Sequence, residues 1–181
     1  MFVGRKKELD ALNSRYKSDR KEFGVLYGRR RIGKSSILNE FLKGKKGILF
    51  QAKQDNSYGN LKSFSYEVDH LLNLPDTFVF ASWQHAFKSI QEYAKNERFV
   101  LIIDEYPYIV SQDSSFSSVL QEFIDHTSDN MMVILSGSDI GFLQREIQNH
   151  ASPLYKRRTF EMEIKKNEFY GRKGICEDGG C

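Results

Sequence analysis

At 181 residues the chain has the length of one domain with a hydrophobic core, and its 40% hydrophobic and 28% charged residues are typical of a globular protein. A net charge of +3 does not by itself indicate nucleic acid binding. No apolar run approaches the roughly 20 residues that span a bilayer, and Met1 leads into charged residues rather than a secretory signal, so we expect a cytoplasmic protein that does not enter a membrane.

The chain opens with a predicted helix and then a predicted strand. Leu9, Leu12 and Tyr16 fall at helical spacing. A charged stretch over residues 19–22 ends this pattern. The apolar run over residues 23–27 that follows is typical of a short buried strand.

Residues 27–36 read Tyr-Gly-Arg-Arg-Arg-Ile-Gly-Lys-Ser-Ser and stand between this strand and a predicted helix over residues 37–42. A glycine-bounded loop in this context indicates a phosphate-binding P-loop. Its backbone N–H groups and the positive end of the helix point at the phosphates. Lys34 can reach the β- and γ-phosphates, and the Ser35 hydroxyl can ligate magnesium. The alternative is a chance glycine-rich turn before an ordinary helix.

The P-loop supplies most of the predicted nucleotide-binding residues. They are Gly28, Arg29, Arg30, Arg31, Ile32, Gly33, Lys34, Ser35 and Ser36. Lys34 is also a predicted catalytic residue, because its ammonium faces the reacting phosphate. The three arginines raise the local positive potential, which helps draw in the nucleotide, and we expect their side chains to point to solvent.

A second strand is predicted over residues 48–52, followed by a polar loop over residues 53–59. The next helix, over residues 61–72, stops before a proline. Ser82 can cap a further helix. The apolar stripe of that helix indicates core packing and consists of Trp83, Phe87, Ile90 and Ala94.

A continuous apolar run over residues 99–103 is typical of a central parallel strand, and it ends in Asp104 and Glu105. Ligands of open α/β sheets gather at the carboxyl ends of the strands. Asp104 is therefore predicted, together with Ser35, to hold Mg²⁺, and Glu105 to orient or deprotonate the attacking water. The alternative for Asp104 is that it only caps a loop.

Further candidate residues follow in the second half of the chain. A helix opening at residues 114–118 precedes a strand over residues 131–135, which ends in Ser136. The Ser136 side chain either contacts the γ-phosphate or the water, in the role called sensor 1, or belongs to an ordinary Ser-Gly turn. Arg157 and Arg158 either supply a cation to the reacting phosphate, in cis or to a neighbouring subunit, or form a solvated basic face.

The last predicted elements are a helix through residues 142–147 and a strand over residues 159–164. Strands and helices thus alternate along most of the chain. This pattern predicts an α/β protein with the three-layer P-loop NTPase fold: a central parallel sheet of about five strands, with helices on both faces. Residues 1–170 form one core domain. Residues 171–181 lack periodicity and are expected to be a disordered tail, whose two cysteines cannot alone close a zinc site.

Several stretches besides the P-loop with its arginine run carry a family resemblance. Residues 2–8 read Phe-Val-Gly-Arg-Lys-Lys-Glu, and residues 102–108 read Ile-Ile-Asp-Glu-Tyr-Pro-Tyr. Residues 135–138 read Leu-Ser-Gly-Ser, and residues 152–159 read Ser-Pro-Leu-Tyr-Lys-Arg-Arg-Thr. Together they resemble a prokaryotic and archaeal ATPase family within the AAA+ and STAND group of P-loop NTPases.

The resemblance implies an ATP-binding core in which the Asp104 strand is not adjacent to the P-loop strand. It also implies that Val3, Gly4 and Arg5 lie near the adenine, and it favours the sensor role of Ser136. Members of the family continue into a helical lid and usually a winged-helix or nuclease-like domain. Because the chain has no such lid after Tyr170, we expect nucleotide binding to survive better than turnover.

The leading functional hypothesis is an ATPase that hydrolyses Mg-ATP to ADP and phosphate and couples the nucleotide state to a conformational change. One alternative is a nucleotide-loaded switch with negligible turnover. Another, borrowed from relatives, is a nucleotide-controlled DNA-associated protein, which the net charge of +3 does not support. The expected ligands are ATP or ADP and Mg²⁺, and the expected partners are further copies of the chain and a C-terminal domain or separate protein.

Overall fold

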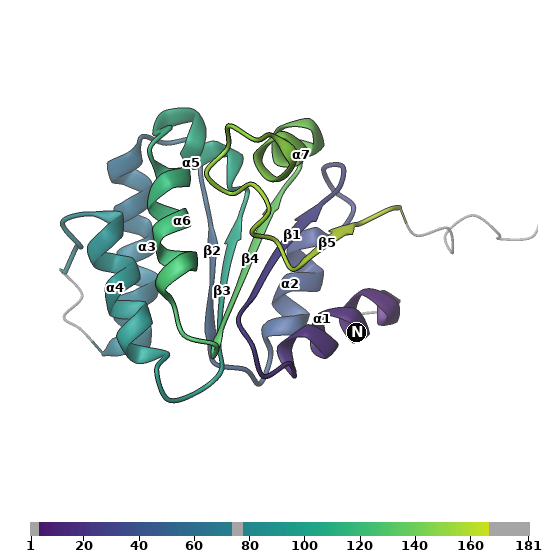
Figure 1. The fold of residues 1–181 in the computed structure, drawn as a ribbon, viewed down its shortest axis with the longest axis horizontal. Coiled ribbons are helices and arrows are strands. Elements are labelled where there is room, and N and C mark those ends of the chain that lie inside the picture. Colours follow the sequence, from purple (N-terminus) through teal and green to yellow (C-terminus); the bar gives the residue numbers. More distant parts are fainter. Residues whose placement is uncertain (1–3, 74–77, 167–181) are drawn as a thin grey trace, which may run out of the picture.

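A parallel sheet of five strands in the order β2-β3-β4-β1-β5 forms the centre of the computed structural model, which describes residues 4–73 and 78–166 (Figure 1). The strands are β1 (Glu22–Tyr27), β2 (Gly47–Gln51), β3 (Phe99–Asp104), β4 (Met131–Gly137) and β5 (Phe160–Glu163). Because β4 lies between β3 and β1, the Asp104 strand is separated from the P-loop strand, which confirms the expected strand order.

Helices cover both faces of this sheet, which gives the three predicted layers. They are α1 (Lys6–Tyr16), α2 (Lys34–Leu42), α3 (Ser57–Leu72), α4 (Trp83–Tyr93), α5 (Pro107–Gln112), α6 (Phe116–His126) and α7 (Ile140–Gln148). Figure 1 shows α3, α4 and α6 on one face and α1 and α2 on the other. Helices α5 and α7 follow β3 and β4, so they lie near the carboxyl ends of these strands.

The central strands are buried on both faces because their alternating side chains enter two separate cores. On β3, for example, Leu101 and Ile103 pack towards α3, α4 and α6, whereas Val100 and Ile102 pack towards α1 and α2. All six residues of β3 are buried. This is why the sequence shows a continuous apolar run there rather than an alternating one.

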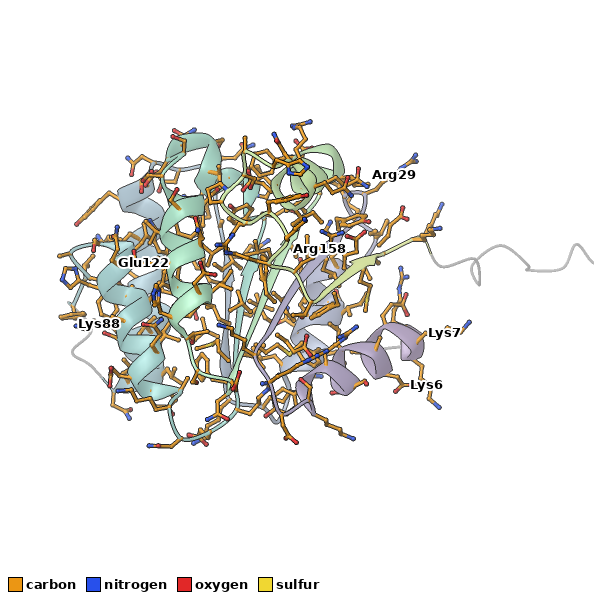
Figure 2. All side chains as sticks on the ribbon, viewed as in Figure 1. Lys6, Lys7, Arg29, Lys88, Glu122 and Arg158 are labelled. Atoms are coloured by element: carbon orange, nitrogen blue, oxygen red, sulfur yellow. The ribbon has the colours of Figure 1, made fainter. Side chains whose placement is uncertain are left out.

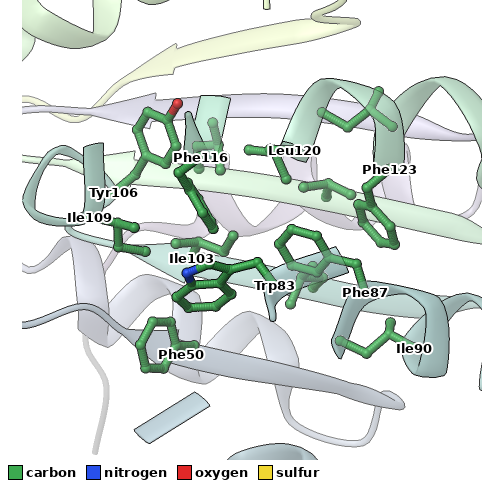
Figure 3. Close-up of a cluster of buried hydrophobic side chains, with 14 of the residues drawn as sticks. Phe50, Trp83, Phe87, Ile90, Ile103, Tyr106, Ile109, Phe116, Leu120 and Phe123 are labelled. Carbon is green, nitrogen blue, oxygen red and sulfur yellow. The ribbon is translucent and has the colours of Figure 1, made fainter. Parts of the chain in front are cut away.

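Aromatic side chains fill the larger core between the sheet and helices α3, α4 and α6 (Figure 3). The Trp83 and Phe116 rings meet edge to face with centroids 4.8 Å apart. Phe87 and Phe123 stack at 4.7 Å. The aromatic stripe of α4 is therefore core packing, as predicted, and its helix is capped by the Ser82 side chain, which accepts from the His85 N–H.

Two local predictions were wrong or incomplete. The polar stretch over residues 53–59 is not all loop, because α3 begins at Ser57, where the Asn56 side chain accepts a hydrogen bond of 2.8 Å from the Gly59 N–H. The short helix α5 was not predicted; it begins with Pro107, whose ring suits the first helical position. Both helices start with capping or turn residues that lack an apolar period.

Candidate functional site

The P-loop joins β1 to α2, and two of its residues have a positive φ. Gly33 precedes α2 with a φ of 90°, and Arg31 has a φ of 62°. At Gly28 a Cβ would lie 2.4 Å from the Ile164 carbonyl oxygen, so a side chain there has no room. The loop therefore depends on glycine at one position for conformation and at the other for close packing.

The Lys34 side chain, on the first residue of α2, is folded into the loop. Lys34 is only 5% exposed, and its Nζ donates to the Gly28 carbonyl at 2.9 Å and to the Arg29 carbonyl at 3.2 Å. Burial lowers the pKa of Lys34 from 10.5, while the carboxylates of Glu105 and Asp104 act in the opposite direction. Because burial disfavours the charged form of Lys34, an anion bound beside its ammonium would stabilise that form.

Asp104 at the end of β3 links the P-loop to the neighbouring strand. Its carboxylate is fully buried, and Oδ2 accepts from the Ser35 hydroxyl at 2.5 Å. Oδ1 accepts from the Ser136 hydroxyl and from the Glu105 backbone N–H, the latter at 3.0 Å. The structure thus brings the ends of β3 and β4 and the start of α2 to one point.

Glu105 follows directly, with a φ of 55° that turns the chain from β3 into α5. Its Oε2 accepts hydrogen bonds from the Ser138 backbone N–H at 3.2 Å and from the Ser138 hydroxyl at 3.1 Å. The Glu105 carboxylate is therefore held by the loop after β4. Within the part of the chain that the structure describes, its Oε1 atom accepts no hydrogen bond and remains for a further donor.

A cleft of about 570 Å³ lies over these groups. Its lining residues come from the P-loop, α2, the end of β2 and the segment after β3, namely Arg30, Arg31, Gly33, Lys34, Ser35, Ser36, Gln51, Ala52, Glu105 and Tyr108. The cleft thus combines the P-loop, Lys34 and the Glu105 carboxylate, and the buried Asp104 carboxylate is connected to it through the Ser35 hydroxyl.

The donors around Ser35 and Asp104 fit a magnesium ion. Mg²⁺ prefers oxygen ligands and is usually held by one or two protein groups together with phosphate oxygens and water. A hydroxyl and a carboxylate 2.5 Å apart supply such a pair. Within residues 4–73 and 78–166 no group of three or more His, Cys, Asp or Glu residues is arranged to hold a metal, so Ser35 and Asp104 would hold the ion jointly with the phosphates.

The Gly-Arg box packs against the P-loop from the amino-terminal side. The Arg5 guanidinium donates to the Ile32 carbonyl at 2.9 Å and to the Lys165 carbonyl at 2.7 Å, and it pairs with Glu8 at 2.9 Å. Gly4 has a φ of 93° and Arg5 one of 65°. Arg5 thus ties the start of the chain to the P-loop, whereas Val3 lies outside the described residues.

The three P-loop arginines differ from one another. Arg29 extends outward from the loop (Figure 2), and Arg31 is exposed. Arg30 does not simply point to solvent as predicted, because its guanidinium donates to the Tyr108 hydroxyl at 2.8 Å and to the Ser138 hydroxyl at 3.4 Å. These contacts span segments that local sequence patterns do not connect.

The structure does not bring Arg158 to the P-loop. The Arg158 guanidinium pairs with Glu161 at 2.6 Å and donates to the Ile147 carbonyl at 3.2 Å. Since β5 pairs with β1 in parallel from Gly24 onward, Arg158 lies near the amino end of β1, and the P-loop follows the carboxyl end. The preceding residue, Arg157, forms an ion pair with Asp125 at 2.8 Å. A catalytic role of Arg158 towards a neighbouring subunit stays a prediction.

Sequence reasoning missed Gln51, Tyr108 and Ser138 as site residues. Gln51 ends β2 and lies beside Asp104 in the register of the sheet. The signal that was available is positional: each of the three ends or closely follows a strand whose carboxyl end meets the P-loop edge.

Comparison with known proteins supports the class that the fold and the site define. Residues 2–170 match a family model described as an ATPase domain predominantly from Archaea. The chain is 29% identical over 171 residues to the uncharacterized protein MJECL04 of Methanocaldococcus jannaschii, a match that covers 93% of the chain and 37% of that protein. A second protein of that organism, the uncharacterized ATP-binding protein MJ0423, is 44% identical over 46 residues, which cover 25% of the chain and 78% of that protein.

Solved structures with the same fold include Aeropyrum pernix ORC2, described as ADPNP-ADP complexes, with a TM-score of 0.62 and 16% identity over 90% of the chain and 48% of that protein. CDC6P from Pyrobaculum aerophilum follows with a TM-score of 0.61 and 13% identity over 91% of the chain and 46% of that protein. The structure of Drosophila ORC bound to DNA has a TM-score of 0.61 and 16% identity, and the match covers 90% of the chain and 43% of the Drosophila protein chain. The chain thus spans less than half the length of each.

The family match and the P-loop between β1 and α2 together define the class of a P-loop ATPase domain. The chain belongs to the ATPase domain family found predominantly in Archaea, whose model covers residues 2–170. Among the described residues, no helix is both long and apolar enough to span a bilayer.

Proposed function

We propose that the chain binds Mg-ATP in the cleft over the P-loop, hydrolyses it to ADP and phosphate, and couples the nucleotide state to a conformational change. The observation that carries this proposal is the contact between Ser35 and Asp104 at 2.5 Å, beside the buried Lys34. The start of α2 and the end of β3 meet there, and they carry the kinds of groups that a metal-bound triphosphate needs.

Each residue has a distinct part in this reaction. The P-loop N–H groups bind the phosphates, and Lys34 exchanges its bonds to the Gly28 and Arg29 carbonyls for the β- and γ-phosphate oxygens. Ser35 and Asp104 would hold Mg²⁺, which would neutralise phosphate charge. Glu105 orients the attacking water and accepts its proton, while Ser136 fixes the Asp104 carboxylate.

The direct test measures ATP binding and phosphate release on the purified chain. Lys34→Ala removes the phosphate-binding ammonium, so we expect ATP affinity to fall by at least about tenfold, the loss of one charge-assisted contact. Glu105→Gln keeps the shape of the side chain but removes the base. We expect it to retain ATP binding and to lower turnover by about 10²-fold or more.

Lys88→Ala is the matched control, since Lys88 is an exposed lysine on α4, which covers the sheet face opposite α2 (Figure 2). It should bind and hydrolyse ATP like the parent chain. If Lys34→Ala bound ATP as tightly as the Lys88→Ala control, the assignment of the phosphate site would be wrong.

A second candidate is a nucleotide-loaded switch with negligible turnover. It is favoured by the two hydrogen bonds from Ser138 to Glu105, because the Oε2 atom that accepts both of them is occupied and cannot at the same time take a proton from water. The same phosphate-release assay separates the two candidates. Turnover of the parent chain no faster than that of Glu105→Gln would favour the switch.

A further inference from the structure

Arg30 lines the cleft, and side chains from two other segments hold its guanidinium in place. Its Nη2 donates to the Tyr108 hydroxyl at 2.8 Å, and its Nε donates to the Ser138 hydroxyl at 3.4 Å. Among the residues that the structure describes, Arg30 is the only hydrogen-bond partner of the Tyr108 hydroxyl. Two side chains from outside the P-loop therefore hold an exposed guanidinium that would otherwise be free to rotate.

The position of this guanidinium places positive charge at the Glu105 end of the cleft. Arg30, Tyr108 and Glu105 all line the cleft with Lys34. The Ser138 hydroxyl accepts a hydrogen bond from Arg30 and donates one of 3.1 Å to Glu105. Ser138 therefore connects the Arg30 guanidinium directly to the proposed base.

An arginine has five N–H donors, and two of those on Arg30 are used by Tyr108 and Ser138. Its other donors make no hydrogen bond to any residue that the structure describes, so they are available to a planar or tetrahedral oxyanion. Of the phosphates of a nucleotide held by the P-loop, the terminal one of a triphosphate lies nearest to the attacking water and its base. That phosphate is the one present in ATP and missing from ADP.

We propose that Arg30 distinguishes a nucleoside triphosphate from a diphosphate by binding the terminal phosphate, and that Tyr108 is the positioning residue that holds it there. This inference rests on the proposed function, since it places the terminal phosphate beside Glu105. Tyr108 lies on α5, which follows Glu105 directly. The contact therefore also connects the terminal phosphate to the helix that leaves the active site.

The test compares the affinities of the purified chain for a non-hydrolysable ATP analogue and for ADP, both with Mg²⁺, by calorimetry. Arg30→Gln should weaken binding of the analogue by about tenfold, the loss of a charge-assisted contact, and change ADP affinity by less than about twofold. Tyr108→Phe removes only the hydroxyl and should weaken binding of the analogue by about threefold. The double variant should be no weaker than Arg30→Gln, because Tyr108 acts through Arg30.

Two controls accompany these variants. Arg29→Gln removes the same charge from the same loop, but the described contacts of its side chain include none to Tyr108 or Ser138, so it should lower both affinities by a similar factor. Tyr66→Phe removes a hydroxyl from an exposed tyrosine of α3 and should change neither affinity.

Each outcome decides the inference. A selective loss of analogue affinity in Arg30→Gln, with non-additivity in the double variant, supports it. Equal losses for analogue and ADP in Arg30→Gln overturn it, because Arg30 then acts only through general attraction. Additive losses overturn the role of Tyr108. If the parent chain binds neither nucleotide, the proposed function itself fails, which is a separate result.

Discussion

Asp104 is a fully buried carboxylate, and hydrogen bonds from three groups stabilise it. Its oxygens accept from Ser35, Ser136 and the Glu105 N–H. Such charge-assisted bonds offset the cost of removing a carboxylate from water. The same bonds fix the direction in which the carboxylate faces, so a residue needed for metal binding is held in place before any ligand arrives.

Lys34 should change its pKa when nucleotide binds. Burial holds its pKa below 10.5, and the negative phosphates act to raise it. Between the lowered pKa and that of the complex, binding takes up a proton, so nucleotide affinity should fall as the pH rises through the lowered pKa. An NMR titration of the Lys34 ε-methylene group, with and without the ATP analogue, measures both values.

The spectrum of Lys34→Arg identifies the Lys34 signal in this titration, because only that signal disappears. A Lys34 pKa that is the same with and without nucleotide would contradict contact between its ammonium and the phosphates.

Among the elements, β5 is held to β1 by a close fit. The Phe160 ring packs directly over Gly24, where a Cβ would lie 2.0 Å from the end of the ring. Backbone bonds continue on both sides of this contact, from the Thr159 N–H to the Phe23 carbonyl and from the Ile164 N–H to the Tyr27 carbonyl, each at 2.7 Å. Glycine at this strand position thus gives β5 room to close the edge of the sheet beside the P-loop.

Gly24→Ala should therefore displace Phe160 and lower the free energy of unfolding by about 1–3 kcal/mol, the usual cost of overpacking. Urea unfolding followed by circular dichroism measures this loss. Phe160→Leu in the same chain should restore part of it, because the smaller side chain leaves room for the new methyl group.

Gly141→Ala serves as the matched control within α7, where the added Cβ would make ordinary contacts with the side chains of Arg145 at 3.5 Å and Asp139 at 3.8 Å. There the same substitution should leave the free energy of unfolding unchanged or raise it by up to about 1 kcal/mol, since alanine loses less backbone entropy than glycine in a helix. Equal effects at both glycines would mean that Phe160 does not depend on Gly24.

For the whole molecule, the parallel sheet gathers the site at one edge. All the strand pairs are parallel, so the carboxyl ends of β1, β3 and β4 meet beside the start of α2. Arg158 does not lie at this edge of the sheet, because it is near the amino end of β1. If it acts on phosphate, it does so on the site of another copy, because the structure holds it at the far end of β1.

Mixing two inactive variants tests that arrangement. Lys34→Ala lacks its own phosphate site but keeps Arg158, and Arg158→Ala has the reverse defect. If Arg158 acts between subunits, the mixture should release phosphate at concentrations where each variant alone does not, because one intact site then receives one intact arginine. Activity of Arg158→Ala alone equal to that of the parent would remove Arg158 from the mechanism.

Much of the candidate site could be predicted from local sequence. Lys34 and Ser35 belong to a contiguous motif, and Asp104 ends an apolar strand, so spacing alone indicates their roles. The strands and most helices follow from apolar periods for the same reason. Helix α5 and the start of α3 were missed because proline and asparagine set their first turns, and neither adds an apolar period.

The sequence by itself therefore determined the fold class, the P-loop and the carboxylate pair, because each is written in neighbouring residues. Only the tertiary structure decided that Arg30 meets Tyr108, 78 positions away, and that Ser138 holds Glu105 across 33 positions. It also decided that Arg158 lies away from the P-loop. Such contacts depend on strand order and on side-chain packing around it, and no short-range pattern of residue types carries that information.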